Sequence, residues 1–187
     1  MGTFLTVVLL LIALLVALIV GVRACVTLWS VVAADAPWVP LSRPGIDAIL
    51  DCLGALPAGT IVVDLGCGDG RVLRAMARRN PAIRGIGIEQ SRVLTMFARQ
   101  WSLLRGFPQL RFERGDFLRR ALTDADVVTC YLWPDVMPTL GEKLRRELRT
   151  GSRVVVVAFP IPGWRPDHIR TISRGGRLFV YRMRSLR

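Results

Sequence analysis

Three glycines at alternate positions follow an apolar run in the stretch IVVDLGCGDGRVL, residues 61–73. Gly66, Gly68 and Gly70 lack Cβ atoms, so the backbone there can turn sharply and approach a ligand closely. A helix starting after them would also offer free N–H groups. The spacing differs from the dinucleotide-binding pattern GxGxxG because Arg71 stands at the last glycine position, and the Gly-Lys-Ser/Thr of a phosphate-binding loop is absent. The glycines therefore predict a small-molecule site whose ligand other residues must specify.

Acidic residues near the ends of the apolar runs could contact such a ligand. Asp64 comes just before the glycines, and Glu89 ends the next apolar segment. A carboxylate at that second position can accept hydrogen bonds from both hydroxyls of a ribose. Asp116, in RGDF, is placed to accept from an adenine amino group, with Phe117 beside it as an apolar wall. Taken alone, Asp116 could equally cap a turn, but acidic residues in this order favour a ligand role.

Alternating strands and helices would position these residues. Helices are expected at 46–53, after the glycines, after the N-cap residue Ser91 and at 134–148. Strands are expected at 61–65, 84–89, 110–113, 126–132, 152–160, 168–173 and 177–183. This alternation implies a parallel sheet with helices on both faces, and RGG between the last two strands indicates a hairpin. The predicted fold class is α/β, with a doubly wound, Rossmann-like, mostly parallel seven-stranded sheet and a C-terminal antiparallel hairpin.

The N-terminal segment predicts a transmembrane helix. Residues 2–22 carry no charge and would form a helix about 31 Å long, which matches the hydrocarbon core of a bilayer. Basic residues begin at Arg23, after the segment, so the positive-inside rule places the following domain in the cytoplasm, at a bacterial inner membrane. We expect residues 1–34 to form the anchor, 35–45 a proline-rich connector and 46–187 the α/β domain.

A cleavable signal peptide is the competing interpretation of this segment. ADA at residues 34–36 could imitate a cleavage site. However, no basic side chain precedes the apolar run, and the run exceeds the usual length of about 7–15 residues. A retained single-pass anchor, with residues 2–22 in contact with the lipid bilayer, is therefore the favoured prediction.

Composition narrows the remaining classes of function. The 187 residues carry a formal charge of +12, and Lys143 is the single lysine among 26 basic residues. Such an arginine-rich surface can favour nucleic acid or anionic lipid, but the arginines are scattered as on solvated faces. Basic and aromatic residues do not interleave, so no nucleic-acid partner is expected. Four cysteines without a CxxC pair and one histidine predict neither a metal site nor a disulfide framework.

Together, the glycine loop and the ordered carboxylates resemble the class I S-adenosylmethionine-dependent methyltransferases. The resemblance implies S-adenosyl-L-methionine as cofactor, with Gly66 and Gly68 beside its methionine moiety and Asp64 near its amino group. It places Glu89 on the ribose and Asp116 on the adenine. The full set of predicted cofactor-binding residues is Asp64, Gly66, Gly68, Asp69, Glu89, Gln90, Asp116 and Phe117.

A closer resemblance covers residues 36–166. The stretches APWVPLSRPG, VVDLGCGDGR, YLWPDVMPTLGEKLRRELRTGSRVV and FPIPGWRP are similar to the small membrane-anchored lysine methyltransferases of the adenine nucleotide translocase and ATP synthase c-subunit type. The chain departs from typical members at Cys67, where they have Ser, and at Gln90, where Asn or Asp is common. The resemblance implies methylation of a lysine in a membrane protein. A methyltransferase of a lipid or quinone, or a cofactor-binding adaptor without catalysis, are the alternatives.

The acceptor site is expected in CYLWP, residues 130–134, just past the fourth strand. Amine methyltransferases carry an Asn/Asp-Pro-Pro-aromatic turn there, and this chain lacks its acidic or amide residue. Tyr131 and Trp133 could still flank the acceptor, and carbonyl groups exposed by Pro134 could accept its N–H. Trp133 could equally be a core residue. We find no convincing general base and expect water to carry the proton.

Overall fold

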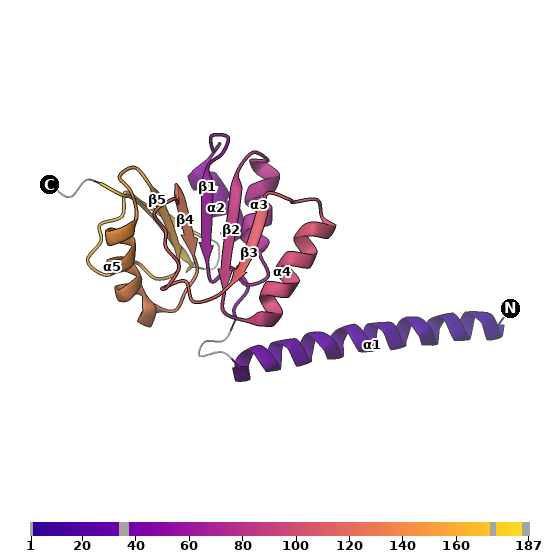
Figure 1. Ribbon diagram of the computed structural model, residues 1–187. Helices are drawn as coiled ribbons and strands as arrows, with labels where there is room; N and C mark the ends of the chain where they lie inside the picture. The colour runs from indigo at the N-terminus through magenta and orange to yellow at the C-terminus, as the bar shows by residue number, and fades with distance from the viewer. Residues whose placement is uncertain (1, 34–37, 173–174, 185–187) are drawn as a thin grey trace. The chain divides into compact units, whose positions relative to one another are not determined.

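The computed structural model describes residues 2–33, 38–172 and 175–184 (Figure 1). Seven strands form one sheet in the order β3-β2-β1-β4-β5-β7-β6. Their bounds are β1 Ile61–Leu65, β2 Arg84–Glu89, β3 Leu110–Arg114, β4 Val127–Cys130, β5 Arg153–Val157, β6 His168–Thr171 and β7 Arg177–Arg182. Strands β1 to β5 run parallel, whereas β7 runs antiparallel to both β5 and β6. The sheet order reverses beside β1, which is where ligands bind in open α/β sheets.

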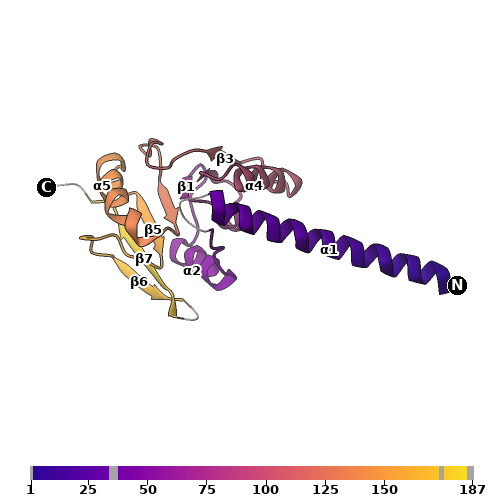
Figure 2. The same ribbon diagram turned by 90° about the horizontal axis from the view of Figure 1, so that it is seen from below.

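Helices cover both faces of this sheet. On one face, α2 (Arg43–Leu53), α3 (Arg71–Arg79) and α4 (Arg92–Leu104) pack onto a core that includes Val62, Leu73 and Val155. The 3₁₀ helix η1 (Pro134–Val136) and α5 (Met137–Glu147) follow β4, and α5 packs on the other face. Figure 2 shows α5 and α2 on opposite sides of the sheet. Because helices cover both faces, β4 and β5 are almost wholly buried, as their continuous apolar sequences predict.

The predicted fold class is confirmed, and the structure adds three details. The fourth strand ends at Cys130 rather than at residue 132, and the next helical turn begins at Pro134. The fifth strand ends at Val157 because Ala158 turns away with a φ of 74°, which is outside the strand region. In the closing hairpin, β7 is the antiparallel member, and the edge strand β6 runs parallel to β1–β5.

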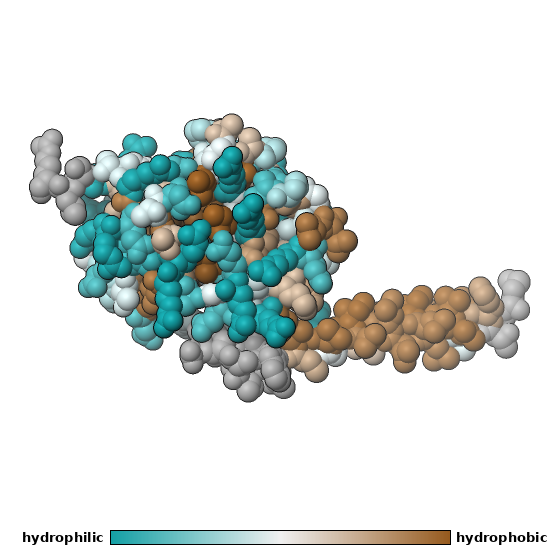
Figure 3. Space-filling model, in the orientation of Figure 1, coloured by the Kyte–Doolittle hydropathy of each residue, from teal (hydrophilic) through white to brown (hydrophobic). Residues whose placement is uncertain are grey.

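The N-terminal helix α1 (Gly2–Ala33) belongs to a separate structural unit, Met1–Val39, while Pro40–Arg187 form the α/β unit. Within α1, Phe4–Val26 are long and apolar enough to cross a membrane, with a mean hydropathy of 3.3. Figure 3 shows that apolar side chains dominate the visible surface of this helix. The cleavage-like residues 34–36, and Pro37 of the connector, lie outside the described residues.

Candidate functional site

The glycine loop lies at the carboxyl end of β1 and is held against β2. The N–H groups of Gly66 and Cys67 both donate to the carbonyl oxygen of Ile88, at 2.9 and 3.1 Å. Gly66, Gly68 and Gly70 have φ values of 69°, 55° and 77°, which side chains with a Cβ rarely adopt. The loop therefore needs glycine at all three positions to make its turn, as the sequence predicts.

Two of these glycines also leave room for neighbouring side chains. A Cβ atom on Gly66 would lie 2.7 Å from Cδ2 of Leu132, and one on Gly70 would lie 2.5 Å from Cε1 of Phe112. Leu132 belongs to the segment after β4, so the glycine loop and the predicted acceptor segment are in close contact. Leu132 could not be predicted as part of this site, because nothing in its residue type distinguishes it from other apolar residues.

Glu89 connects the glycine loop to the start of α4. Its Oε2 accepts a 2.9 Å hydrogen bond from the N–H of Gly68, and its Oε1 accepts one of 2.8 Å from the N–H of Ser91. Each carboxylate oxygen has two lone pairs, so both can accept a further hydrogen bond. Glu89 is therefore fixed in position while it keeps acceptor capacity for a pair of ligand hydroxyls.

Asp64 is buried beneath the loop at 4% exposure. Its Oδ1 accepts a 2.7 Å hydrogen bond from Oγ1 of Thr129, which is its register partner on β4. Burial is the main cause that raises the pKa of Asp64 to about 7; the Thr129 hydroxyl opposes it, and the carboxylates of Glu89 and Asp69 add to it. The proximity of the Asp64 and Glu89 carboxyl groups favours a positively charged ligand. Thr129 was missed because the pairing of β1 with β4 is a tertiary relationship.

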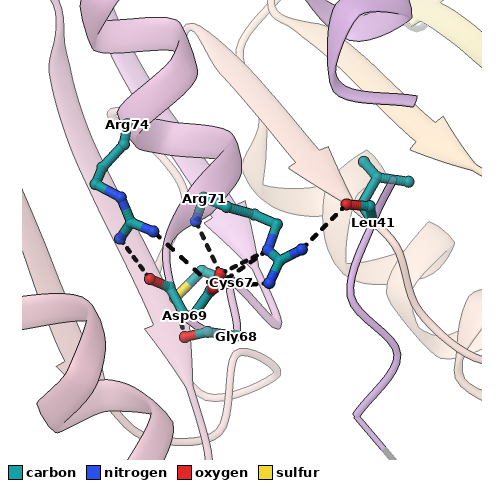
Figure 4. A network of polar contacts seen from close by, with 6 residues as sticks. All are labelled: Leu41, Cys67, Gly68, Asp69, Arg71 and Arg74. Atoms are coloured by element: carbon teal, nitrogen blue, oxygen red, sulfur yellow. Dashed lines mark hydrogen bonds and ion pairs between the residues drawn. The ribbon is translucent and has the colours of Figure 1, made fainter. Parts of the chain in front are cut away.

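Asp69 is engaged by two arginines of α3 (Figure 4). Its carboxylate accepts hydrogen bonds from Arg71 Nε at 2.9 Å and Nη2 at 2.8 Å, and Arg74 lies 4.0 Å away. The Arg74 guanidinium also donates to the Asp69 carbonyl oxygen. Arg71 reaches the carbonyl oxygen of Leu41, ahead of α2, at 3.4 Å. Asp69 therefore braces the loop, and its role in cofactor binding stays a prediction.

The remaining predicted cofactor residues lie at the same edge of the sheet. Asp116 is partly exposed, and its carboxylate accepts from the N–H of Leu118 at 2.8 Å, which is the turn-capping contact that the sequence left open. Phe117 is half-buried and packs against the α5 side of the core. Gln90 is exposed. The ends of β2 and β3 are joined there by a 3.0 Å hydrogen bond from Gly115 N–H to the Glu89 carbonyl oxygen.

The predicted acceptor residues follow β4 directly. Tyr131 is half-buried and packs against the core on the α2–α3 side, whereas the Trp133 side chain is 45% exposed. Pro134 is exposed and opens η1. Trp133 is therefore a surface residue rather than a core residue, so its indole ring is available at this edge.

A strained residue that sequence analysis missed lies at the end of the neighbouring strand. Ala158 has a φ of 74°, the one positive value among described residues other than glycine. Phe159, which follows it, is 36% exposed. Backbone strain of this kind costs about 1–3 kcal/mol and clusters at functional sites. Parallel strands β4 and β5 end at the same edge, so this turn lies on the same side of the sheet as the acceptor segment.

Comparisons with known proteins agree with this geometry. Residues 64–168 match the family model described as the ANTKMT methyltransferase domain, which covers more than half of the chain. The chain belongs to this family. It is 30% identical over 142 residues to a protein-lysine N-methyltransferase of Saccharolobus islandicus, covering 74% of this chain and 86% of that protein.

Two animal relatives are similarly close over the same region. The chain is 32% identical over 134 residues to the Xenopus laevis lysine N-methyltransferase of the ATP synthase c-subunit, covering 71% of this chain and 58% of the frog protein. It is 33% identical over 148 residues to the Mus musculus adenine nucleotide translocase lysine N-methyltransferase, covering 78% of this chain and 62% of the mouse protein. The chain thus spans little more than half the length of these relatives.

A solved structure extends the likeness to the whole α/β unit. An RNA methyltransferase of Salinibacter ruber in complex with S-adenosyl-L-homocysteine superposes with a TM-score of 0.73 at 30% identity, covering 80% of this chain and 96% of that one. S-adenosylmethionine is the cofactor of this ANTKMT family domain. The residues present fit its charge, because the carboxyl groups of Asp64 and Glu89 lie close enough to interact, and the ammonium and sulfonium groups of the cofactor are cationic.

Proposed function

We propose that the protein is a membrane-attached, S-adenosylmethionine-dependent methyltransferase that modifies a lysine side chain of a membrane protein. The observation that carries this proposal is the similarity to a protein-lysine N-methyltransferase over 86% of that relative's length. Two further relatives are named for lysines of the ATP synthase c-subunit and of the adenine nucleotide translocase, which supports a membrane protein as substrate.

In this proposal the cofactor-binding residues are those at the carboxyl ends of β1, β2 and β3. Glu89 accepts from the ribose hydroxyls, and Asp64 offsets the positive charge of the methionine amino group. Asp116 accepts from the adenine amino group, with Phe117 beside it. The positive φ values of Gly66 and Gly68 let the loop turn, and its backbone then lies beside the methionine moiety. When bound, the cofactor supplies an electrophilic methyl group on a sulfonium.

The acceptor lysine must reach this site as a neutral amine, because only its lone pair can form the new C–N bond. Tyr131 and Trp133 provide an aromatic environment that excludes water, and desolvation lowers the pKa of an amine. The carbonyl oxygens of Trp133 and Pro134 accept the backbone N–H groups of Val136 and Met137. Each has a second lone pair, which in this proposal accepts an N–H of the amine. The residues hold donor and acceptor in line, the proton leaves to water, and S-adenosylhomocysteine is the second product.

Membrane attachment through α1 is the second part of the proposal. Phe4–Val26 are long and apolar enough to cross a bilayer. Arg23 lies near the carboxyl end of this span, and the other basic side chains of the chain follow it. The positive-inside rule then places the α/β unit in the cytoplasm of a bacterial cell. Anchoring raises the effective concentration of acceptors in the same membrane.

RNA methylation is the second candidate function. It is favoured by one observation: the Salinibacter ruber structure that matches at 30% identity is named an RNA methyltransferase. The net charge of +12 is compatible with a polyanionic substrate. The protein-lysine candidate is preferred because several relatives named for lysine methylation match the chain over at least 71% of its length.

One experiment separates these candidates. Full-length protein in detergent is incubated with radiolabelled S-adenosylmethionine and membranes, or total RNA, from a strain that lacks the gene. Label in a membrane protein, located on lysine by mass spectrometry, is the expected result. Label in RNA supports the second candidate, and label in extracted lipid supports a small lipophilic acceptor. The Glu89→Ala variant serves as the control for label that does not depend on the cofactor site.

A second experiment tests the anchor. Removal of residues 1–34 is expected to leave cofactor binding intact while methylation of the membrane acceptor falls steeply. Equal rates on membranes for the truncated and full-length proteins would contradict a role of the anchor in substrate selection. Protease added to the outer side of intact cells should leave the α/β unit undigested, and its digestion would reverse the proposed orientation.

A further inference from the structure

Helix α4 carries its large apolar side chains on the outside of the α/β unit. Five of them are between 42% and 80% exposed: Met96, Phe97, Trp101, Leu103 and Leu104. At 100° per residue these side chains fall within an arc of about 160° of the helix surface, so they lie on one side of the helix, with the exposed Gln100 among them. Figure 3 shows apolar surface gathered over the carboxyl-terminal part of α4. We refer to these five residues as the α4 stripe.

The opposite side of α4, which packs on the sheet, consists of smaller and more polar residues. Thr95, Ala98 and Ser102 are at most 2% exposed, and Leu94 is 5% exposed. Within the described part of the chain, the buried Ser102 Oγ has no hydrogen-bond partner. The usual pattern of a surface helix, apolar side inward and polar side outward, is therefore reversed here. An apolar stripe of this breadth indicates an interaction surface.

Arginines border the α4 stripe on both sides. On the helical wheel, Arg92 and Arg99 lie next to one margin of the stripe, which Met96 and Leu103 form. Arg105, just after the helix, lies next to the other margin, which Trp101 forms. The Arg105 guanidinium lies 5.1 Å from the centre of the Trp101 ring. No acidic residue occurs between Gln90 and Phe112, so the whole segment is cationic. An apolar stripe with a tryptophan, bordered by arginines, is the pattern of a helix that lies in the headgroup region of an anionic bilayer.

Chain length brings the bilayer within reach of this surface. Only nine residues, 34–42, separate the end of α1 at Ala33 from the start of α2 at Arg43. Fully extended, they would span roughly 30 Å. If Phe4–Val26 cross the membrane, the last seven residues of α1 add about 10 Å. The α/β unit therefore stays close enough to the headgroups for one of its faces to contact them.

We propose that the α4 stripe is a second membrane contact, which inserts into the interface of an anionic bilayer and fixes the orientation of the α/β unit. This inference rests on the proposed attachment through α1. Because Ser91, the N-cap of α4, is hydrogen-bonded to Glu89, a docked α4 also holds the cofactor edge of the sheet at a constant distance from the membrane surface. A lysine at the headgroup level is then the acceptor within reach.

The test places an environment-sensitive fluorophore on single cysteines of the full-length protein. Leu104→Cys reports on the α4 stripe. Ile169→Cys is the matched control, because Ile169 is also apolar and 57% exposed, but lies on β6 at the opposite edge of the sheet. Cys25 and Cys52 are replaced by serine. Cys67 and Cys130 remain, because both are at most 5% exposed and burial raises their thiol pKa values.

The labelled proteins are reconstituted in vesicles of phosphatidylcholine and phosphatidylglycerol and exposed to two quenchers, iodide in water and a nitroxide-labelled lipid. We expect blue-shifted emission and strong lipid quenching at position 104, with iodide quenching at position 169. Vesicles of phosphatidylcholine alone should weaken lipid quenching at position 104. Stronger iodide than lipid quenching at position 104 would overturn the proposal, since the stripe would then face water.

Shielding of position 104 from both quenchers would also overturn the proposed membrane contact. A protein surface, either a second copy or α1, would then cover the α4 stripe. Vesicle flotation and extraction at alkaline pH report separately on α1. Protein that floats and resists extraction but fails the quenching test would retain the proposed attachment without the α4 contact. A failure of the protein to associate with the vesicles at all would overturn both the attachment through α1 and the α4 contact.

Discussion

The N–H of Gly68 donates a 2.9 Å hydrogen bond to Glu89 Oε2 and thereby joins two segments that lie 21 residues apart in sequence. The same carboxylate accepts from Ser91 N–H, so a single side chain sets the positions of the glycine loop and the N-terminus of α4. Two backbone donors hold the carboxylate in one orientation, with lone pairs still available. Glu89 is thus already in place before a ligand arrives, which reduces the entropy lost on binding.

We expect Glu89→Ala to weaken binding of S-adenosylmethionine by about 2–4 kcal/mol, because two charge-assisted hydrogen bonds to the ribose are lost. Isothermal titration calorimetry measures this difference directly. Glu113→Ala is the matched control, since Glu113 is a carboxylate at the end of the adjacent strand and pairs with Arg120 on the surface. Equal affinity of the Glu89 variant and the wild type would remove Glu89 from the site.

Cofactor binding should release a proton near neutral pH. Burial raises the pKa of Asp64 to about 7 in the ligand-free protein, so a large fraction is protonated there, whereas a cationic ligand favours the ionised form. Affinity is therefore expected to rise as pH increases through about 7. Calorimetry in buffers of different ionisation enthalpy counts the proton. In Asp64→Asn this pH dependence should disappear, and its persistence would assign the proton to another group.

The raised pKa of Asp64 should also make the folded protein less stable as pH increases. The pKa of Asp64 is higher in the folded protein than its ordinary value of 3.8, so its contribution to stability is complete below about pH 4 and is lost as pH rises through about 7. We expect the melting temperature of the ligand-free wild type, relative to Asp64→Asn, to fall over this range. A constant difference between the two proteins across the range would contradict the raised pKa.

Thr129→Val should increase the pKa of Asp64 further, because the Thr129 hydroxyl is the donor that stabilises its ionised form. The pH at which cofactor affinity rises would then move upward. Above that pH the variant should also lose about 1–3 kcal/mol of stability, since a buried carboxylate is left without its donor. Thr129→Ser keeps the hydroxyl and should behave as the wild type in both measurements.

Trp133→Ala should reduce the turnover number for the lysine acceptor while leaving cofactor affinity unchanged. The indole is 45% exposed at the end of β4, so its removal should not affect folding. Without this aromatic side chain, water reaches the lysine amine, its pKa is lowered less, and a smaller fraction of it is neutral. Steady-state kinetics on the membrane acceptor, with cofactor affinity measured in parallel, distinguish the two effects. An unchanged turnover number would show that Trp133 does not contribute to the acceptor site.

The protein should not methylate itself on lysine. Its single lysine, Lys143, is 4% exposed, and its Nζ lies 2.8 and 2.7 Å from the two carboxylate oxygens of Glu147. A paired and buried ammonium offers no lone pair to a methyl donor. Mass spectrometry after prolonged incubation with S-adenosylmethionine should show unmodified Lys143. A methylated Lys143 would mean that α5 opens on the timescale of the experiment.

Local signals in the amino-acid sequence were enough to predict most of the strands and helices. Periodicity, glycines and prolines are local signals, and they predicted β1 and β2 with the bounds observed. The glycine loop and Glu89 also predicted the place of a ligand site, because both come at the ends of strands that must meet at one edge of a parallel sheet. The resemblance to the methyltransferase family implied which cofactor binds there. The apolar character of α1 was equally a property of the residues alone.

The contacts of these residues follow from strand pairing and helix packing, which local patterns do not encode. Pairing of β1 with β4 brings Thr129 to Asp64 and so sets the charge state of that carboxyl, and no local pattern encodes the register. Asp69 is a predicted cofactor residue, and only the structure shows that Arg71 and Arg74 of α3 lie beside its carboxylate. The α4 stripe is a second feature that local sequence patterns do not predict. Large apolar side chains ordinarily face a core, but here small side chains pack against the sheet and leave the large ones outside, because burial depends on which neighbours the fold supplies.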